Sequence, residues 1–317
     1  AVAAQEAGVD GFCVAVIDEA VALRENGITK PILILGASPE MEAPYMAKFN
    51  LSTAVSDLHF LQMAQPLLAA QNLKLKVHLA LDTGMGRIGF RDQKTVKAAI
   101  EFMDHHQAQF EFEGIFTHFS TADSADDSYF KKQLNKFHEL MEVVTQRPRY
   151  VHVANSAASI WHKQCGGNMI RLGIGMYGLN PSGKEVQLPH DVALKPAFEL
   201  TSHIVEVKQV HPGDSISYGT TYTATKDEWI GTVPMGYADG WLRRMQGSTV
   251  LVDGQECEIV GRICMDQFMI RLPHEVPLGT KVTLIGENGG KQKTAQDAAD
   301  YAGTIHYEIL CSIGQRV

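Results

Sequence analysis

Residues 168–178 read NMIRLGIGMYG, an apolar and glycine-rich stretch with a single charged side chain, Arg171. Arginine is almost never buried without partners, because the guanidinium stays charged and can only donate hydrogen bonds. At a strand end, followed by glycines that leave backbone N–H groups accessible, such a residue suits a bound anionic heterocycle such as a phosphorylated cofactor. The alternative is a structural strand in which Arg171 pairs with an internal carboxylate.

This stretch closes a series of short apolar runs that alternate with amphipathic helical patterns over the first 180 residues or so. Such alternation predicts an α/β fold with a parallel sheet. A closed (β/α)8 barrel needs eight strands. Because the chain begins in the helical pattern AVAAQEAG, we expect a barrel that lacks its first strand. The expected strands are 11–16, 31–36, 51–56, 76–82, 114–120, 150–154 and 169–173, with helices at 17–25, 58–72, 95–105 and 129–144.

The pattern changes after the linker-like segment PSGKEVQLPHDVALKP, residues 181–196. Short strand patterns and turn signals follow, including an Asp-Gly hairpin signal at residues 253–254. We therefore expect a barrel domain over residues 1–190 and a mostly β domain over residues 191–317. The expected strands of the second domain are 203–210, 228–234, 248–252, 258–263, 268–271 and 281–285.

Composition excludes several classes of function. The net charge of −8, without any basic run, argues against a nucleic-acid partner. The five cysteines are odd in number and lack C-x-x-C spacing, which suggests neither a disulfide framework nor a metal site. No apolar run reaches membrane-spanning length, and no signal peptide precedes the first helical pattern. We expect a cytoplasmic protein with no membrane partner.

The segment GMGRIGF, residues 84–90, contains the spacing G-x-G-x-x-G of a dinucleotide-binding turn. It follows the fourth expected strand instead of opening the domain, and no acidic residue ends the next strand about twenty residues later. A strand-end loop that delivers Arg87 to the mouth of the barrel fits better, because barrel active sites use residues at the C-terminal ends of strands.

Three further strand ends carry polar residues by the same logic: His118, then His152 with Ser156, then Arg171. A single histidine at such a place is more often structural than catalytic. Together with Arg87, however, these residues on successive strands face one mouth, which favours a shared site.

Seven motifs, in this order, resemble the alanine racemase family, whose members are fold-type III pyridoxal-phosphate enzymes. The motifs are GMGRIGF, THFS, VANSAAS, IRLGIGMYGL, SYGTTY, GYADGW and GRICMDQ. The resemblance covers essentially the whole chain. It implies a two-base interconversion of L- and D-alanine that supplies D-alanine for peptidoglycan, a pyridoxal 5′-phosphate cofactor, no metal, and a homodimer in which one subunit's β domain reaches the other's barrel.

The resemblance also assigns roles. Arg171 matches the arginine that faces the pyridine nitrogen, Tyr218 the base for the L-enantiomer, and His152 the histidine that links this tyrosine to the arginine. Arg87 matches a residue near the ring hydroxyl of the cofactor, and Tyr237 and Met265 match substrate contacts. Residues that match the family's cofactor-binding positions, chiefly for its phosphate, are His118, Asn155, Ser156, Gly173, Ile174 and Tyr307.

Two departures from the family are visible. The family's Schiff-base lysine lies in a K-A-(N/D)-A-Y-G-H-G run at the end of the first barrel strand, and the sequence has no such run. We therefore expect a racemase sequence incomplete at both ends and inactive as residues 1–317 alone. Ala80 stands where many members have a lysine that orients the arginine matching Arg87, so Arg87 should have a substitute counter-charge, either Asp82 or a small anion.

Two other functions are considered. A pyridoxal-phosphate decarboxylase of basic amino acids shares both domains, but the motifs GYADGW and GRICMDQ favour the racemase. A cofactor-binding or dimer-forming protein without turnover is supported only by the absent lysine. Substrate breadth, alanine against serine and other small amino acids, depends on pocket contacts worth a few kcal/mol and stays open.

Overall fold

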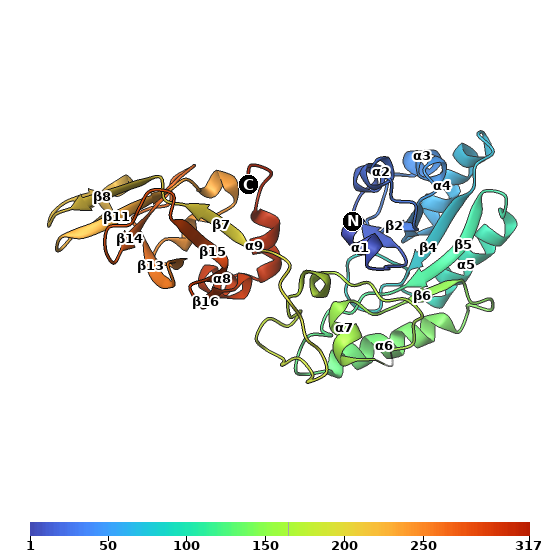
Figure 1. The fold of residues 1–317 in the computed structure, drawn as a ribbon. Helices are drawn as coiled ribbons and strands as arrows, with labels where there is room; N and C mark the ends of the chain where they lie inside the picture. Colours follow the sequence, from blue (N-terminus) through green and yellow to red (C-terminus); the bar gives the residue numbers. More distant parts are fainter. Residues whose placement is uncertain (164) are drawn as a thin grey trace. The chain divides into compact units, whose positions relative to one another are not determined.

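The computed structural model describes residues 1–163 and 165–317, which form two compact units (Figure 1). Unit 1 comprises Ala1–Gly175 and Lys184–Ala193, and unit 2 comprises Met176–Gly183 and Leu194–Val317. The chain thus passes from unit 1 to unit 2 at residue 176, returns at residue 184 and leaves again at residue 194. In the described part of the chain, no helix is long and apolar enough to cross a membrane.

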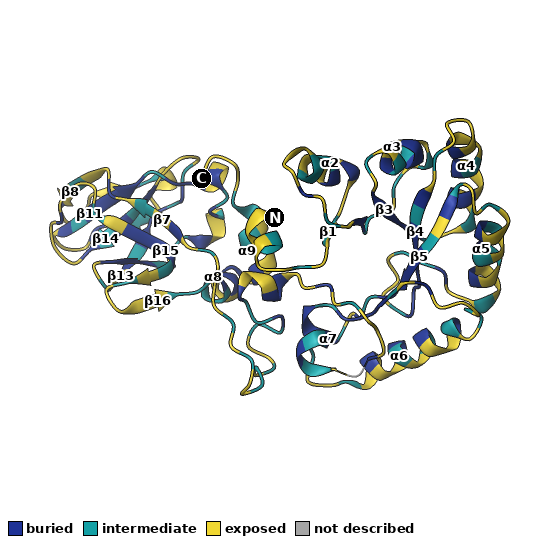
Figure 2. Cartoon of the chain, turned by 45° about the vertical axis from the view of Figure 1, so that its right-hand side comes forward, coloured by how far each residue is buried: buried dark blue, intermediate teal, exposed yellow. Residues whose placement is uncertain are grey.

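Unit 1 is built on a six-stranded parallel sheet whose strands follow in sequence order. The longer helices pack along one side of this curved sheet (Figures 1 and 2). This arrangement confirms the predicted barrel-type α/β fold. The strands are β1 (Phe12–Val14), β2 (Ile32–Ile34), β3 (Ser52–Val55), β4 (Leu75–Ala80), β5 (Phe110–Phe116) and β6 (Tyr150–His152), and the helices are α1 (Val2–Glu6), α2 (Ile17–Glu25), η1 (Glu40–Glu42), α3 (Ala43–Lys48), α4 (Leu58–Ala69), α5 (Gln93–His105), α6 (Ser128–Met141) and α7 (Ser156–Trp161).

The predicted seventh strand, 169–173, is wrong as a strand. Among the described residues, a single parallel bridge, between Ala154 and Ile170, continues the strand order beyond β6. The chain then leaves the sheet, because the glycines after Arg171 lead into the short 3-10 helix η2 (Ile174–Tyr177) instead of an extended strand. Arg171 nevertheless lies where the prediction put it, beside the end of β6.

Alternation along the strands divides the apolar side chains of unit 1 between two clusters. In β4, Val77 and Leu79 pack in the large core shared with the helices, whereas Ala80 belongs to a small cluster with Ala54 and Phe116. Each fully buried leucine or valine stabilises the fold by roughly 1.5–3 kcal/mol. Because side chains alternate along a strand, His78 lies on the face of β4 that points away from this large core, and it is also buried.

Unit 2 is mostly β, as predicted. Its main sheet is antiparallel, with strand order β16-β15-β12-β13-β14-β11-β8, and β7 pairs with β15. The strands are β7 (Leu200–His203), β8 (Glu206–Val210), β9 (Ser215–Ile216), β10 (Tyr222–Thr223), β11 (Glu228–Val233), β12 (Thr249–Val252), β13 (Gln255–Val260), β14 (Phe268–Leu272), β15 (Lys281–Asn288) and β16 (Lys291–Lys293), and the helices are η3 (Tyr218–Thr220), η4 (Tyr237–Asp239), η5 (Arg243–Met245), α8 (Ala295–Ala302) and α9 (His306–Ser312).

The predicted Asp-Gly hairpin joins β12 and β13. Asp253 and Gly254 both have positive φ, 46° and 75°, as a type I′ turn requires. A Cβ atom on Gly254 would lie 2.8 Å from the carbonyl oxygen of Gly289. Glycine is thus needed here for its backbone conformation and for the close approach of a second turn.

The turn gives a stability prediction for unit 2. Gly254→Ala should lower the free energy of unfolding by about 1–2 kcal/mol, because alanine is strained at this φ and contacts the Gly289 backbone. Gly279→Ala is the matched control, since Gly279 also has positive φ, 85°, but its Cβ would meet nothing within 4 Å. Thermal melts give the loss of unfolding free energy for each variant, and the difference between the two losses is the cost of the contact with Gly289. Equal losses would show that the approach to Gly289 is unimportant.

Candidate active site

Arg171 organises the site of unit 1 from a buried position, with 8% of its surface exposed. Its Nη1 lies 2.7 Å from Nδ1 of His152 and donates to the His152 carbonyl at 2.8 Å. Its Nη2 donates to the Thr117 carbonyl at 2.7 Å and lies 3.3 Å from Nδ1 of His118. A guanidinium has five N–H donors, and these contacts account for four of them. Among the described residues, the fifth N–H, on Nε, has no acceptor.

Burial lowers the pKa of Arg171 to about 10; the smaller effects are those of Cys13, which raises it, Arg87, which lowers it, and Cys165, which raises it. The guanidinium therefore stays charged near neutral pH. Because it has no lone pair to offer, every nitrogen or oxygen that it contacts must be an acceptor.

His152 does not have the position that the resemblance implied for it. Its ring is fully buried, with Nδ1 against Arg171 and Nε2 2.8 Å from Nδ1 of His78. Both ring nitrogens are thus occupied inside unit 1, and neither is left for a tyrosine. The expected link between Arg171 and a tyrosine through His152 is therefore corrected: His152 contacts Arg171, but on the interior side.

His118 is the histidine that combines contact with Arg171 and partial exposure. Its Nδ1 faces Arg171, and its Nε2 lies 3.5 Å from the side-chain nitrogen of Asn155. Burial, then the charge of Arg171, then that of Arg87 lower the pKa of His118 to about 4. At neutral pH the ring is therefore uncharged. Because Nδ1 accepts from Arg171, the single proton of this ring is on Nε2, and the long approach of the Asn155 side-chain nitrogen then joins two donors and is not a hydrogen bond.

Ser156, at the start of α7, accepts hydrogen bonds from two backbone N–H groups of the glycine-rich stretch. Its buried hydroxyl accepts from the N–H groups of Gly173 at 2.9 Å and Gly175 at 3.3 Å. Both lone pairs are then used, and the hydroxyl proton has no acceptor among the described residues. Asn155 instead caps α7 by accepting from Ala158 N–H at 2.9 Å and donates to the Phe119 carbonyl at 3.2 Å. The Asn155 side chain thus supports the site, and its predicted contact with a cofactor stays a prediction.

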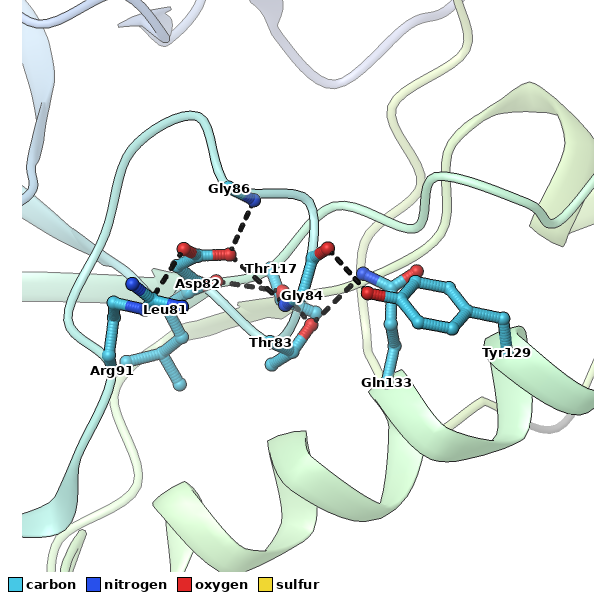
Figure 3. A network of polar contacts seen from close by, with 9 residues as sticks. All are labelled: Leu81, Asp82, Thr83, Gly84, Gly86, Arg91, Thr117, Tyr129 and Gln133. Atoms are coloured by element: carbon cyan, nitrogen blue, oxygen red, sulfur yellow. Dashed lines mark hydrogen bonds and ion pairs between the residues drawn. The ribbon is translucent and has the colours of Figure 1, made fainter.

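The glycine-rich loop after β4 is a braced strand-end loop (Figure 3). Asp82 accepts from the backbone N–H groups of Gly84 at 3.0 Å and Gly86 at 2.9 Å, and pairs with Arg91 at 3.5 Å. The Tyr129 hydroxyl donates to the Gly84 carbonyl at 2.8 Å. The carboxylate therefore fills the turn that a pyrophosphate would occupy in a dinucleotide fold, in agreement with the rejection of that fold.

A second part of the same network holds the end of β5. The hydroxyls of Thr83 and Thr117 are 2.8 Å apart, and Thr117 donates to the Leu81 carbonyl at 2.8 Å (Figure 3). From α6, Gln133 donates to the His118 carbonyl at 3.1 Å and to the Thr83 hydroxyl at 3.4 Å. These bonds fix the backbone at Thr117, whose carbonyl accepts from Arg171.

Arg87 is exposed, yet its charge acts on the site, because it lowers the pKa of both His118 and Arg171. The expectation that Asp82 is its counter-charge is wrong, since Asp82 is committed to loop amides and to Arg91. Within residues 1–163 and 165–317, no carboxylate forms an ion pair with Arg87. Ala80, at the expected lysine position, is buried in the small apolar cluster with Ala54 and Phe116.

Unit 2 brings together the three motifs predicted for its half of the site. The Ser217 hydroxyl donates to the Arg262 carbonyl, and a Cβ on Gly219 would lie 2.9 Å from Nη1 of Arg262. The N–H of Tyr237 donates to the Cys264 carbonyl at 3.2 Å. Loops 217–220, 236–240 and 262–267 thus form one surface. Three predicted side chains of these loops are exposed there: Tyr218 (69%), Tyr237 (45%) and Met265 (54%).

Tyr307 lies on α9 of unit 2, whereas Ser156, Gly173 and Ile174 belong to unit 1. The predicted phosphate-binding residues are therefore divided between the two units. Sequence reasoning missed His78, Glu113 and Gln133, which are buried polar side chains. A signal was present for Gln133, which interrupts the apolar face of α6, and a buried polar group requires partners. His78 and Glu113 gave no such signal, because at strand spacing they follow Lys76 and Glu111. In the described part of the chain, no group of three or more metal-ligating side chains is found.

Two family models match this chain. "Alanine racemase, N-terminal domain" matches residues 1–181, and "Alanine racemase, C-terminal domain" matches residues 197–317. The alanine racemase of Ligilactobacillus salivarius (strain UCC118) is 61% identical over 315 residues, covering 99% of this chain and 84% of that protein. The alanine racemase of Lactiplantibacillus plantarum is 56% identical over 317 residues, with the same coverage.

Solved structures agree. The crystal structure of alanine racemase from E. faecalis has a TM-score of 0.96 and 51% identity, and the match covers 99% of this chain and 84% of that one. A histidine racemase from Leuconostoc mesenteroides has a TM-score of 0.93 at 34% identity, with 98% and 83% coverage. The fold is thus shared by racemases of different amino acids.

The lowered pKa of His118 predicts a pH dependence of stability. The folded chain protonates this ring only near pH 4, whereas the unfolded chain does so near pH 6.5. Between these values the unfolded chain binds more protons, so stability falls as the pH falls. His118→Gln should remove up to about 3 kcal/mol of that loss. Urea unfolding of unit 1 at several pH values measures it.

His59→Gln is the control, because His59 is an exposed histidine of the same unit. This variant should retain the pH slope of the unmodified chain. An unchanged slope in His118→Gln would contradict the burial and charge effects described for His118.

Proposed function

This chain belongs to the alanine racemase family, whose activity is the racemisation of alanine, an isomerase reaction. We propose that the protein uses pyridoxal 5′-phosphate held by unit 1 and that Tyr218 of unit 2 transfers a proton. The observation that carries the proposal is the donor count of Arg171. Four of its five N–H groups are bound inside unit 1, and the Nε–H alone is left for a ligand.

The residues of unit 1 fit a phosphorylated pyridine ring. Such a ring offers a nitrogen acceptor, which suits the Nε–H of Arg171. Its phosphate offers oxygen acceptors, which suit the hydroxyl proton of Ser156 and backbone N–H groups of the glycine-rich segment around Gly173 and Ile174. Charge-assisted bonds of this kind are about twice as strong as neutral ones.

When bound, pyridoxal phosphate supplies a conjugated ring that accepts the charge left on the α-carbon after a proton is removed. Arg171 limits this acceptance. Because the guanidinium keeps its protons near neutral pH, it leaves the facing ring nitrogen unprotonated. We propose that this arrangement favours prompt return of the proton over side reactions.

Proton transfer is assigned to Tyr218, and we propose that His118 assists it. A phenol is protonated near neutral pH, so it needs assistance to act as a base. An uncharged His118 with its proton on Nε2 can donate to a phenolate oxygen while Nδ1 stays against Arg171. This replaces the role first expected of His152. Arg87, Tyr237 and Met265 are proposed to contact the substrate or the ring hydroxyl.

A homodimer with shared active sites is part of the proposal. It is supported by the exposure of Tyr218, at 69%, and by apolar side chains exposed around the glycine-rich stretch, such as Ile170 (59%) and Leu172 (51%). Exposed groups of this kind are typical of interfaces. Alanine is the proposed substrate, and the D-alanine formed is proposed to serve peptidoglycan synthesis.

The family's lysine run is absent from the printed sequence. That residues 1–317 by themselves do not racemise alanine stays a prediction. An optical-rotation assay of this chain, beside a version extended by the family's lysine-bearing segment, tests it.

The phosphate contact is tested without any assay of activity. Ser156→Ala should weaken binding of pyridoxal phosphate by about tenfold, because one charge-assisted donor is lost. Binding of pyridoxal, which has no phosphate, should change little. Fluorescence titration measures both affinities, and Ser159→Ala is the control on the same helix. Equal weakening for both ligands would place Ser156 away from the phosphate.

The role of Tyr218 is tested in an active enzyme. Tyr218→Phe should reduce racemisation by about 10²–10⁴-fold, because one of two opposed proton-transfer groups is lost. Exchange of the α-hydrogen of D-alanine in deuterium oxide should persist, since the opposite face keeps its own base. The control is Tyr45→Phe, an exposed tyrosine of unit 1. Equal loss of exchange for both enantiomers would rule out a one-face role.

A further inference from the structure

Four neighbouring strands of unit 1 contribute one buried row of polar side chains that ends at Arg171. Nδ1 of His152 (β6) lies 2.7 Å from Nη1 of Arg171, and its Nε2 lies 2.8 Å from Nδ1 of His78 (β4). Nε2 of His78 lies 3.0 Å from Oε2 of Glu113 (β5), which also accepts from the Ser52 hydroxyl of β3. At most 5% of the surface of His78, Glu113, Ser52 or His152 is exposed.

The two ends of the row give every hydrogen bond in it one direction. Arg171 can only donate, so Nδ1 of His152 accepts, and the proton of this ring is on Nε2. That proton is donated to Nδ1 of His78, whose own proton is therefore on Nε2. The Glu113 carboxylate, which can only accept, receives it.

A second proton on His78 is incompatible with this geometry. A proton on its Nδ1 would require Nε2 of His152 to accept, while Nδ1 of His152 already accepts from Arg171. His152 would then have no proton at all. Burial and then the charge of Arg171 also hold the pKa of His152 well below its usual value. Both rings are therefore neutral links between one cation and one anion.

Glu113 is kept as that anion. Burial by itself raises the pKa of its carboxyl, but the hydrogen bonds from His78 and Ser52, with the charge of Lys76, outweigh burial and lower it. Arg171 therefore does not pair with an internal carboxylate directly: among the described residues, Glu113 is linked to it only through the rings of His78 and His152.

The backbone of β5 is adapted to this row. Val77 pairs with Phe112 but His78 pairs with Gly114, so Glu113 is one extra residue, a β-bulge. Bulges redirect side chains, and this one brings Glu113 to the side of the sheet occupied by His78. A Cβ on Gly114 would lie 2.4 Å from Nδ1 of His78, so only glycine leaves room for the ring.

We propose that His78 and Glu113 are positioning residues for Arg171. Together they hold His152 with its lone pair toward Arg171, so that the guanidinium keeps one orientation with only its Nε–H turned to the ligand site. That the Nε–H of Arg171 faces a ligand site rests on the proposed function, whereas the direction of the hydrogen bonds from Arg171 to Glu113 does not.

The first experiment examines the unmodified chain without cofactor. Two-bond ¹H–¹⁵N correlation spectra of histidine-labelled protein distinguish the two neutral tautomers, with His78→Gln and His152→Gln variants for assignment. Both rings should be protonated on Nε2 alone near neutral pH. An Nδ1-protonated or doubly protonated ring at either position would overturn the proposal, and this readout needs no variant that folds poorly.

The second experiment measures the orientation of Arg171 through the solvent exchange of its side-chain N–H signals. Glu113→Leu removes the acceptor for His78 and should accelerate this exchange at least tenfold, because the row loses its fixed end. Glu113→Gln keeps an acceptor and should retain slow exchange. Glu111→Leu is the matched control, as an exposed glutamate on the same strand. Slow exchange in Glu113→Leu would overturn the proposal.

Affinity for pyridoxal phosphate is measured on the same variants. A loss of about tenfold in Glu113→Leu, restored in Glu113→Gln, is expected. If no variant and not even the unmodified chain binds pyridoxal phosphate, the proposed function fails. The tautomer and exchange results would still decide whether His78 and Glu113 position Arg171. If the unmodified chain binds pyridoxal phosphate tightly and Glu113→Leu binds it equally well, the row does not hold the Nε–H of Arg171 toward the ligand site.

Discussion

A buried guanidinium must find an acceptor for each of its N–H groups, because it cannot lose its charge near neutral pH and has no lone pair of its own. In unit 1 this requirement is met by carbonyl oxygens of His152 and Thr117 and by one nitrogen each of His152 and His118. The backbone at the ends of β5 and β6 is therefore held in place by Arg171. The same count leaves one donor for a ligand.

The two histidines that contact Arg171 differ in environment and hence in use. His152 is fully buried, and both its nitrogens are bound. His118 is partly exposed, and its second nitrogen has only the long contact to Asn155. Both are uncharged near neutral pH, since burial and the adjacent cation disfavour protonation. A neutral imidazole ring beside a cation accepts a hydrogen bond at one nitrogen and donates one at the other, and it adds no charge to the site.

Comparison with known racemases supports two separate statements, one about the family of this chain and one about its fold. High identity to alanine racemases over 99% of the chain shows the family and its reaction. The histidine racemase with nearly the same fold shows that the scaffold does not select the amino acid. Tyr237 and Met265, which we propose to contact the substrate, are exposed on a unit 2 surface whose backbone is held by hydrogen bonds.

The sequence was enough to predict the α/β fold of the first domain, the β-rich second domain, the hairpin at Asp253 and the family, because these follow from local periodicity, turn chemistry and ordered motifs. It also pointed to Arg171. It did not reveal that residues 169–173 leave the sheet, that both ring nitrogens of His152 are bound in the interior of unit 1, or that Asp82 forms an ion pair with Arg91. Only tertiary structure decided these points, since the partner of a polar side chain is set by which strands become neighbours. The row from Arg171 to Glu113 includes a direct contact between His78 and His152, which are 74 positions apart in the sequence, and it is held together by the pairing of β4, β5 and β6.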